Sequence, residues 1–221
     1  MGEALMVGMA EVKVTRSPED VLIALGLGSC IGVCAYDAQA RVAGLAHVVL
    51  PNSAGHEPSP GKFADTAIPL LLQEMIKLGA VVERIRVALA GGAQLFASGG
   101  QGTRLEIGSR NAAAVQAELS KRNLCILAAD LGGSVGRTVN LYANGCVRVK
   151  TIGQGERELV SLADREVPAG MPGAGSIRIP GSPAAAGPPG KTGPGPVRDA
   201  EKRAVFEQEA RRNAWSSDRI G

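Results

Sequence analysis

The apolar residues in the first fifty positions are spaced as in short β-strands. Alternating or continuous apolar stretches cover residues 8–14, 21–25, 31–36 and 42–50, and the polar turn DAQAR joins the last two stretches. Stretches of this length that are rich in Val, Ile and Leu and bounded by turn residues are typical of strands. We therefore predict two short strands followed by a longer hairpin.

Helical spacing begins after the loop PNSAGHEPSPGK. Residues 65–78 and 111–121 each carry an apolar stripe with a helical period, and Gly79 supplies a stop for the first of them. Between and after the two predicted helices, the segments RIRVALAGG, LCILAAD and RTVNLYANGCVRVKTIG indicate further strands, with an Asn-Gly hairpin in the last segment. This mixture of strands, several of them in antiparallel hairpins, with two main helices predicts the α+β class.

The composition changes sharply near residue 165. Residues 168–197 contain 8 Pro and 8 Gly among 30 positions, with almost no large apolar side chains. Such a segment cannot bury enough apolar surface to fold. We predict a catalytic domain over residues 1–165, a disordered linker over 166–197 and a charged tail over 198–221. The tail is interpreted either as solvated chain or as a short helix that docks on a partner.

Charge and cysteine content exclude several classes of protein. The chain has 24 Lys and Arg against 21 Asp and Glu, a net charge of only +3, which is too small for a strongly basic nucleic-acid surface. The N-terminal sequence has neither the cationic start nor the apolar run of an export signal or membrane anchor, so we expect a cytoplasmic protein without membrane insertion. Its four cysteines form no CxxC pair and are expected to be free thiols.

Two glycine-rich segments fail as phosphate-binding motifs. In GLGSCI the position that a dinucleotide fingerprint requires to be glycine is Ile31, and upstream of GKT the first glycine of a phosphate loop is replaced by Ala185. No cofactor is therefore expected. A metal site built on Cys30, His47 and Cys34 would lack a fourth ligand, so no metal is expected either.

The candidate chemistry is a thiol beside an imidazole. Cys30 follows a glycine-rich turn, and His47 is the only ionisable residue of its predicted strand. A tight turn that pairs Tyr36 with Arg41 would place Cys30 directly opposite His47, with Cβ atoms about 4.5 to 5.5 Å apart. A register shift of one residue would separate them onto opposite faces. The alternative interpretation is a neutral histidine packed beside a core cysteine.

Backbone donors near this pair are the candidates for holding substrate. Free amide N–H groups are expected around Gly28 and Ser29, because a glycine-rich turn lets the main chain approach a ligand closely. Gly91 and Gly92 end a predicted strand, and Asn111 lies at the start of a predicted helix, where N–H groups lack partners. We treat these five residues as candidate substrate-binding or oxyanion-binding residues.

Five motifs in order resemble one known family. GLGSCIGVCAYD, AGLAHVVLP, PGKFADTAIPLL, AGGAQLF and IGSRN, within residues 8–155, are similar to the bacterial chemoreceptor glutamine deamidase family, CheD. The resemblance implies a layered α/β/β/α fold shared with bacterial toxin deamidases. It also implies hydrolysis of selected glutamine side chains on methyl-accepting chemotaxis receptors, and in some members of glutamyl methyl esters. A chemotaxis phosphatase is a further partner that the resemblance permits.

Carried over to this chain, the family's nucleophile falls on Cys30 and its general base on His47. A threonine often precedes the nucleophile by six residues as a third catalytic group, and Ala24 stands at that position here. The hydrogen bond that orients the imidazole must therefore be missing or come from elsewhere, from Ser29 or a backbone carbonyl. The sequence thus supports a cysteine amidohydrolase, with a non-catalytic module that binds receptors or a phosphatase as the alternative.

Overall fold

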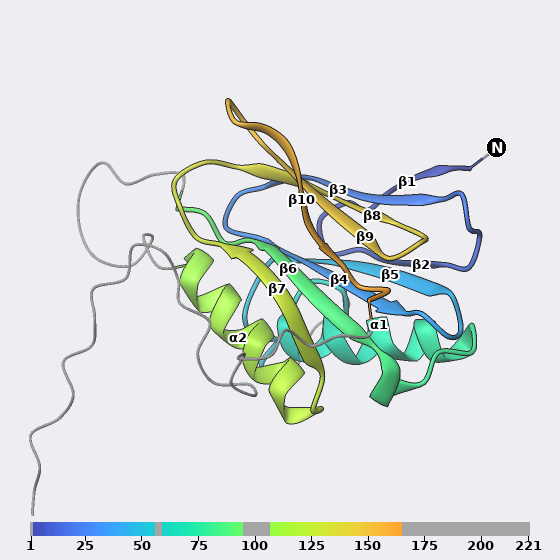
Figure 1. The fold of residues 1–221 in the computed structure, drawn as a ribbon. Helices are drawn as coiled ribbons and strands as arrows, with labels where there is room; N and C mark the ends of the chain where they lie inside the picture. The colour runs from blue at the N-terminus through green and yellow to red at the C-terminus, as the bar shows by residue number, and fades with distance from the viewer. Residues whose placement is uncertain (1, 56–58, 95–106, 165–221) are drawn as a thin grey trace, which may run out of the picture. The chain divides into compact units, whose positions relative to one another are not determined.

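A computed structural model describes residues 2–55, 59–94 and 107–164 of the chain (Figure 1). The predicted linker at 166–197 and the charged tail at 198–221 lie outside the described residues, and so do Leu95 and Phe96 of the AGGAQLF motif. None of the helices in the described ranges is long and apolar enough to cross a membrane. The fold of residues 2–164 is therefore what positions the candidate site.

The first of two five-stranded sheets has the order β1-β3-β8-β9-β10, with β1 and β3 parallel and the other neighbours antiparallel. Its strands are β1 (Ala4–Met6), β3 (Val21–Leu27), β8 (Arg137–Tyr142), β9 (Cys146–Thr151) and β10 (Gly155–Ser161). Buried and less buried residues alternate along β8, as expected for a sheet that covers a core with one face only.

The second sheet has the order β2-β5-β4-β6-β7, with β6 and β7 parallel and the other neighbours antiparallel. Its strands are β2 (Val12–Thr15), β5 (Val42–Val48), β4 (Ile31–Asp37), β6 (Arg86–Gly91) and β7 (Cys125–Leu131). Every residue of β4 and β5 is buried, because this sheet is covered on both faces. The hairpin predicted between residues 31 and 50 is therefore the centre of the fold.

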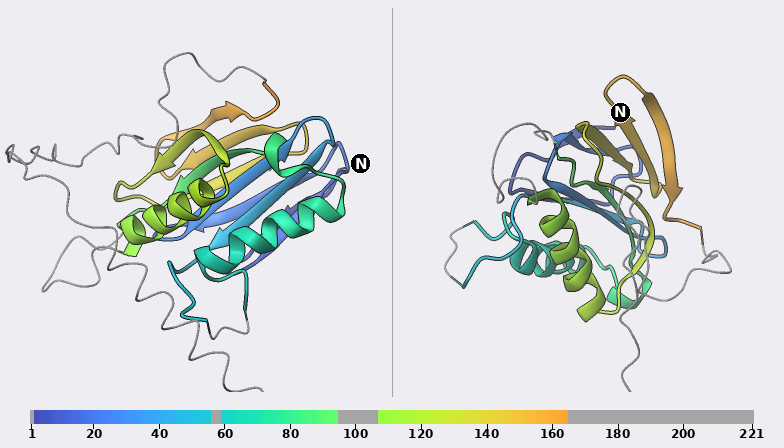
Figure 2. Two further views of the ribbon diagram at one scale, coloured as in Figure 1. Left: turned by 90° about the horizontal axis from the view of Figure 1, so that it is seen from below. Right: turned by 90° about the vertical axis from the view of Figure 1, so that its left-hand side faces the viewer.

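Two helices, α1 (Ala64–Lys77) and α2 (Ile107–Lys121), and a short 3-10 helix, η1 (Val82–Arg84), complete the described elements. α1 and α2 contribute to one core cluster with the second sheet, and the two sheets enclose a separate apolar cluster between them. Figures 1 and 2 show both helices on the same side of the second sheet. The α+β class is confirmed, but the layer order of the described residues is α/β/β, not the expected α/β/β/α.

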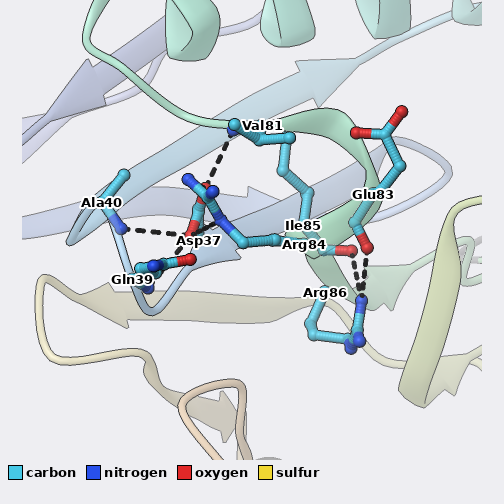
Figure 3. Close-up of polar contacts among 8 residues, drawn as sticks. All are labelled: Asp37, Gln39, Ala40, Val81, Glu83, Arg84, Ile85 and Arg86. Atoms are coloured by element: carbon cyan, nitrogen blue, oxygen red, sulfur yellow. Dashed lines mark hydrogen bonds and ion pairs between the residues drawn. The ribbon is translucent and has the colours of Figure 1, made fainter.

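A buried carboxylate fixes the turn between β4 and β5 (Figure 3). Asp37 is fully buried and accepts hydrogen bonds from the main-chain N–H groups of Gln39, Ala40 and Val81, and from the guanidinium of Arg84 at 2.8 to 3.1 Å. Burial raises the pKa of Asp37, but these hydrogen bonds outweigh it and hold the pKa below its ordinary value of 3.8. The ionised carboxylate therefore ties this hairpin to η1.

Candidate active site

Cys30 lies in a three-residue bend between β3 and β4 whose carbonyl groups are all held. The carbonyl of Gly28 accepts from the N–H of Ala93 at 2.7 Å, and that of Cys30 accepts from the N–H of Gly92 at 2.9 Å. The carbonyl of Ser29 accepts from the side-chain amide of Asn111 at 2.9 Å. The bend is thus fixed by two segments that lie far from it in the sequence.

Glycine is required where β6 meets this bend. Gly91 has a φ of +120°, and a Cβ atom there would lie 2.1 Å from the carbonyl oxygen of Cys30. Gly92 has a φ of +70° and donates its N–H to that same oxygen. The N–H of Gly92 therefore already has a partner, and the role of this glycine as a substrate-binding or oxyanion-binding residue stays a prediction. Gly91 thus lets β6 approach the bend closely, and Gly92 holds the carbonyl of Cys30.

His47 lies near the end of β5 and is 3% exposed. Its main chain is bonded on both sides to the N-terminal segment, with the N–H donated to Glu11 and the carbonyl accepting from Ala10, each at 3.0 Å. Ring atom Nδ1 lies 3.2 Å from the carbonyl oxygen of Val7. A carbonyl can only accept, so Nδ1 carries the proton and Nε2 is left with a lone pair that can act as a base.

This contact supplies the hydrogen bond that orients the imidazole of His47. The sequence could not identify its acceptor, because Ala24 stands where the family often has a threonine. A backbone carbonyl holds the imidazole, and it belongs to Val7, a residue that the sequence analysis did not single out. Ala24 itself is fully buried in the cluster between the sheets. Main-chain acceptors of this kind carry no sequence signature, because every residue has one.

The register between β4 and β5 differs from the predicted one by two residues. Gly32, not Cys30, lies opposite His47, and Asp37 pairs with Val42. A shift of two residues preserves the side of the sheet, because side chains alternate with a period of two. Cys30 packs against the cluster between the sheets, and among the described residues no hydrogen bond joins its thiol to His47. Cys30 thus lies just before the paired residues of β4, two positions from the glycine that faces His47.

Electrostatics leave both groups neutral. Burial raises the pKa of the Cys30 thiol above its ordinary value of 9.0, although its own backbone N–H acts in the opposite direction. Burial lowers the pKa of His47 below 6.5, against smaller opposing effects of the Val7 carbonyl and of Glu11. At neutral pH the protein therefore holds a thiol and a neutral imidazole, not a preformed thiolate–imidazolium pair.

The other cysteines are also free thiols and lie elsewhere in the fold. Cys34 shares the side of β4 that faces the other sheet but is fully buried, and burial raises its pKa far above that of a reactive thiol. Cys125 lies in β7 and Cys146 in β9. Within residues 2–55, 59–94 and 107–164, no group of three His, Cys, Asp or Glu side chains could hold a metal ion.

Asn111, in α2, is completely buried and does not face solvent. Its Nδ2 donates to the carbonyl of Ser29 at 2.9 Å and to the carbonyl of Val49 at 2.8 Å. The prediction that this residue contacts substrate is thus not supported by its position. The structure places its amide between Ser29, the residue before Cys30, and Val49, which directly follows β5.

The two sheets with helices on one side define an α+β protein. Its candidate thiol–imidazole centre consists of Cys30 on the bend and the buried His47, two residues along the sheet from each other in register. The family described as "CheD chemotactic sensory transduction" matches residues 49–151. The chain is 44% identical over 160 residues to the "Probable chemoreceptor glutamine deamidase CheD" of Desulfitobacterium hafniense (strain DSM 10664 / DCB-2), covering 71% of this chain and 99% of that protein.

Two further relatives agree. The chain is 47% identical over 154 residues to the protein of the same name from Caldanaerobacter subterraneus, covering 68% of this chain and 94% of that one. It is 42% identical over 153 residues to the "Chemoreceptor glutamine deamidase CheD" of Thermotoga maritima, covering 69% and 94%. The chain belongs to the CheD family.

Proposed function

We propose that this protein hydrolyses specific glutamine side chains of methyl-accepting chemotaxis receptors to glutamate, as a protein-glutamine glutaminase, with Cys30 as nucleophile and His47 as general base. The observation that carries the proposal is the braced bend. All three of its carbonyls accept hydrogen bonds from distant segments of the chain, and the cysteine that it carries is partly exposed. The names of the relatives supply the class of substrate.

The reaction requires no group beyond the chain, the glutamine and one water. Nε2 of His47 accepts the thiol proton of Cys30 as the sulfur attacks the side-chain amide carbon, because neither group is charged beforehand. Backbone N–H groups of the bend stabilise the resulting oxyanion. The imidazolium then donates its proton to the leaving nitrogen, and ammonia departs from a thioester.

The second half of the reaction uses the same imidazole. A water donates a proton to Nε2 while its oxygen attacks the thioester carbon. The thiol is restored as sulfur leaves with the proton from His47, and the product is a glutamate side chain. Each turnover therefore adds one negative charge to the receptor. The Val7 carbonyl keeps Nε2 directed at the reacting groups throughout, because it holds the proton on Nδ1.

We propose that residues 1–165 contain this machinery and that the protein acts in the cytoplasm, where the thiol stays reduced. A chemotaxis phosphatase is a second proposed partner. The alternative function is a non-catalytic module that binds receptors or such a phosphatase. Ala24 favours this alternative, because it stands at the position where the family often has a threonine as third catalytic group.

The test measures ammonia release from purified receptor, together with the gain of about one dalton at modified glutamines by mass spectrometry. Wild type should deamidate the receptor, and Cys30→Ala should leave a folded protein with no measurable turnover. His47→Gln should lower the rate by roughly 10² to 10⁴. Cys146→Ala is the matched control, because it removes a thiol from β9 and should retain activity. A Cys30→Ala protein with full activity would exclude this mechanism, and an inactive wild type would favour the binding module.

A further inference from the structure

We infer that Asn111 is a positioning residue that fixes the peptide between Ser29 and Cys30, so that the N–H of Cys30 faces the reacting carbonyl as an oxyanion donor. This inference rests on the proposed function. It differs from the sequence prediction, in which Asn111 contacts the substrate itself. A completely buried side chain behind the bend can act on the reaction only through the main chain that it holds.

The peptide between Ser29 and Cys30 sets the direction of the Cys30 N–H. The carbonyl of Ser29 and the N–H of Cys30 belong to the same planar unit, and the described chain contains no cis peptide bond. In a trans peptide these two groups point in opposite directions. Because the amide of Asn111 holds the Ser29 carbonyl on the α2 side, the N–H of Cys30 is directed away from α2.

The hydrogen bonds of the bend leave the N–H of Cys30 without a partner in another described residue. The carbonyls of Gly28 and Cys30 are held by main-chain N–H groups of Ala93 and Gly92. The carbonyl of Ser29 is the one in the bend that a side chain holds. Within the described residues, no hydrogen bond from the N–H of Cys30 to another residue is present, and this N–H lies close enough to the Cys30 sulfur to lower the pKa of the thiol. The donor is therefore directed away from α2 and bonded to no other described residue.

The amide of Asn111 uses its donors but not its oxygen in the described residues. Nδ2 uses its two hydrogens on the carbonyls of Ser29 and Val49, whereas Oδ1 is buried and has no hydrogen-bond partner among the described residues. A buried unpaired acceptor destabilises a fold and calls for an explanation. Only an amide offers two donors on one atom at this size, so the position keeps asparagine for its donors and tolerates the unpaired oxygen.

The second carbonyl connects this brace to the base. Val49 directly follows β5, two residues after His47. One amide group therefore spans the bend that carries the nucleophile and the strand end that follows the base. Asn111→Asp keeps the shape but places carboxylate oxygen against two carbonyl oxygens. That substitution should release the Ser29 carbonyl and free the peptide to rotate.

The experiment compares two reactions of the same thiol in the full-length protein. Deamidation passes through an oxyanion, whereas alkylation by iodoacetamide displaces iodide and forms none. Alkylation of the Cys30 peptide is followed by mass spectrometry, so that other thiols do not interfere. For Asn111→Asp we expect a fall of about 10² to 10³ in kcat for deamidation. The alkylation rate of Cys30 should stay within about threefold of wild type.

Asn140→Asp is the matched control. Asn140 lies in β8 and its amide donates to Glu156, so the same chemical change there should leave both rates unchanged. The same two rates are measured for Asn111→Ala, so that the inference can still be tested if Asn111→Asp misfolds. Both variants are assayed at temperatures below the onset of their unfolding. Equal losses of deamidation and alkylation, or a wild-type kcat in either folded variant, would overturn the inference. Loss of deamidation in the wild type itself would instead overturn the proposed function.

Discussion

Gly91→Ala places a methyl group against the carbonyl of Cys30, the proposed nucleophile. The added Cβ would lie 2.1 Å from the carbonyl oxygen of Cys30, whereas ordinary contacts begin at 3.4 Å. The oxygen belongs to the main chain and is already bonded to the N–H of Gly92, so it cannot rotate away as a flexible side chain could. The bend at Cys30 or the end of β6 must therefore move by roughly 1 Å.

The expected magnitude has two parts. A non-glycine residue at a φ of +120° stores roughly 1 to 3 kcal/mol of backbone strain. Separation of the N–H of Gly92 from the Cys30 carbonyl removes a hydrogen bond with a net contribution of about 0.5 to 1.5 kcal/mol. Together they predict a loss of roughly 1.5 to 4.5 kcal/mol in the free energy of unfolding. A displacement of about 1 Å at the reacting atom predicts a fall of about 10²-fold in kcat.

Gly153→Ala separates strain from collision. Gly153 lies in the turn between β9 and β10 with a φ of +79°, and an added Cβ would meet nothing within 4 Å. Its substitution should lower the free energy of unfolding by about 1 to 2 kcal/mol through strain alone and leave kcat unchanged. Urea unfolding and steady-state deamidation of purified receptor measure the two quantities. Equal stability losses in both variants, with wild-type kcat for Gly91→Ala, would refute the idea that close approach at residue 91 positions Cys30.

Three further changes test other parts of the structure. Burial raises the pKa of Cys30 and lowers the pKa of His47, so the rate of Cys30 alkylation should rise with pH through a midpoint above 9.0. For the same reason the midpoint of the acid limb of kcat/KM should lie below pH 6.5. An alkylation rate that is already constant near pH 7 would show a preformed ion pair. Asp37→Asn should lower the free energy of unfolding by about 1.5 to 3 kcal/mol in urea by removing the charged acceptor of Arg84, and this difference should shrink below pH 3.8 as the depressed pKa of Asp37 is approached; a constant difference would contradict the role of charge. Ala24→Thr should destabilise the protein by about 1 to 3 kcal/mol without raising the deamidation rate, because the position is fully buried and a main-chain carbonyl already orients His47; a faster enzyme would show that the hydroxyl was needed.

The hairpin at the centre of the fold shows what the sequence could and could not predict. Apolar patterning located both strands and the side of the sheet that Cys30 and His47 share. It did not give the register, because turn width depends on hydrogen bonds that the pattern does not contain. The carboxylate of Asp37 holds the N–H groups of Gln39 and Ala40, and the paired part of the hairpin ends at Asp37 and Val42.

In the described residues the layers follow the order α/β/β, and the burial of particular strands gives the physical reason. Every residue of β4 and β5 is buried, whereas buried and less buried residues alternate along RTVNLY in β8. A continuous apolar strand indicates a sheet covered on both faces, and an alternating strand indicates one covered face. Compared strand by strand, this difference would have placed both helices over the second sheet.

The candidate site could be predicted only in part, because two motifs without reactive side chains shape it. The diglycine of AGGAQLF and the asparagine of IGSRN lie some sixty and eighty residues after Cys30, yet both hold carbonyls of its bend. Cys30 and His47 could be proposed from the sequence as the reacting side chains because thiols and imidazoles are rare. The groups that direct them are an amide behind the bend, glycines that let two backbones touch and a carbonyl at Val7. Because such groups act through the main chain, the selection that maintains this site should constrain the residues behind it as strictly as those that react.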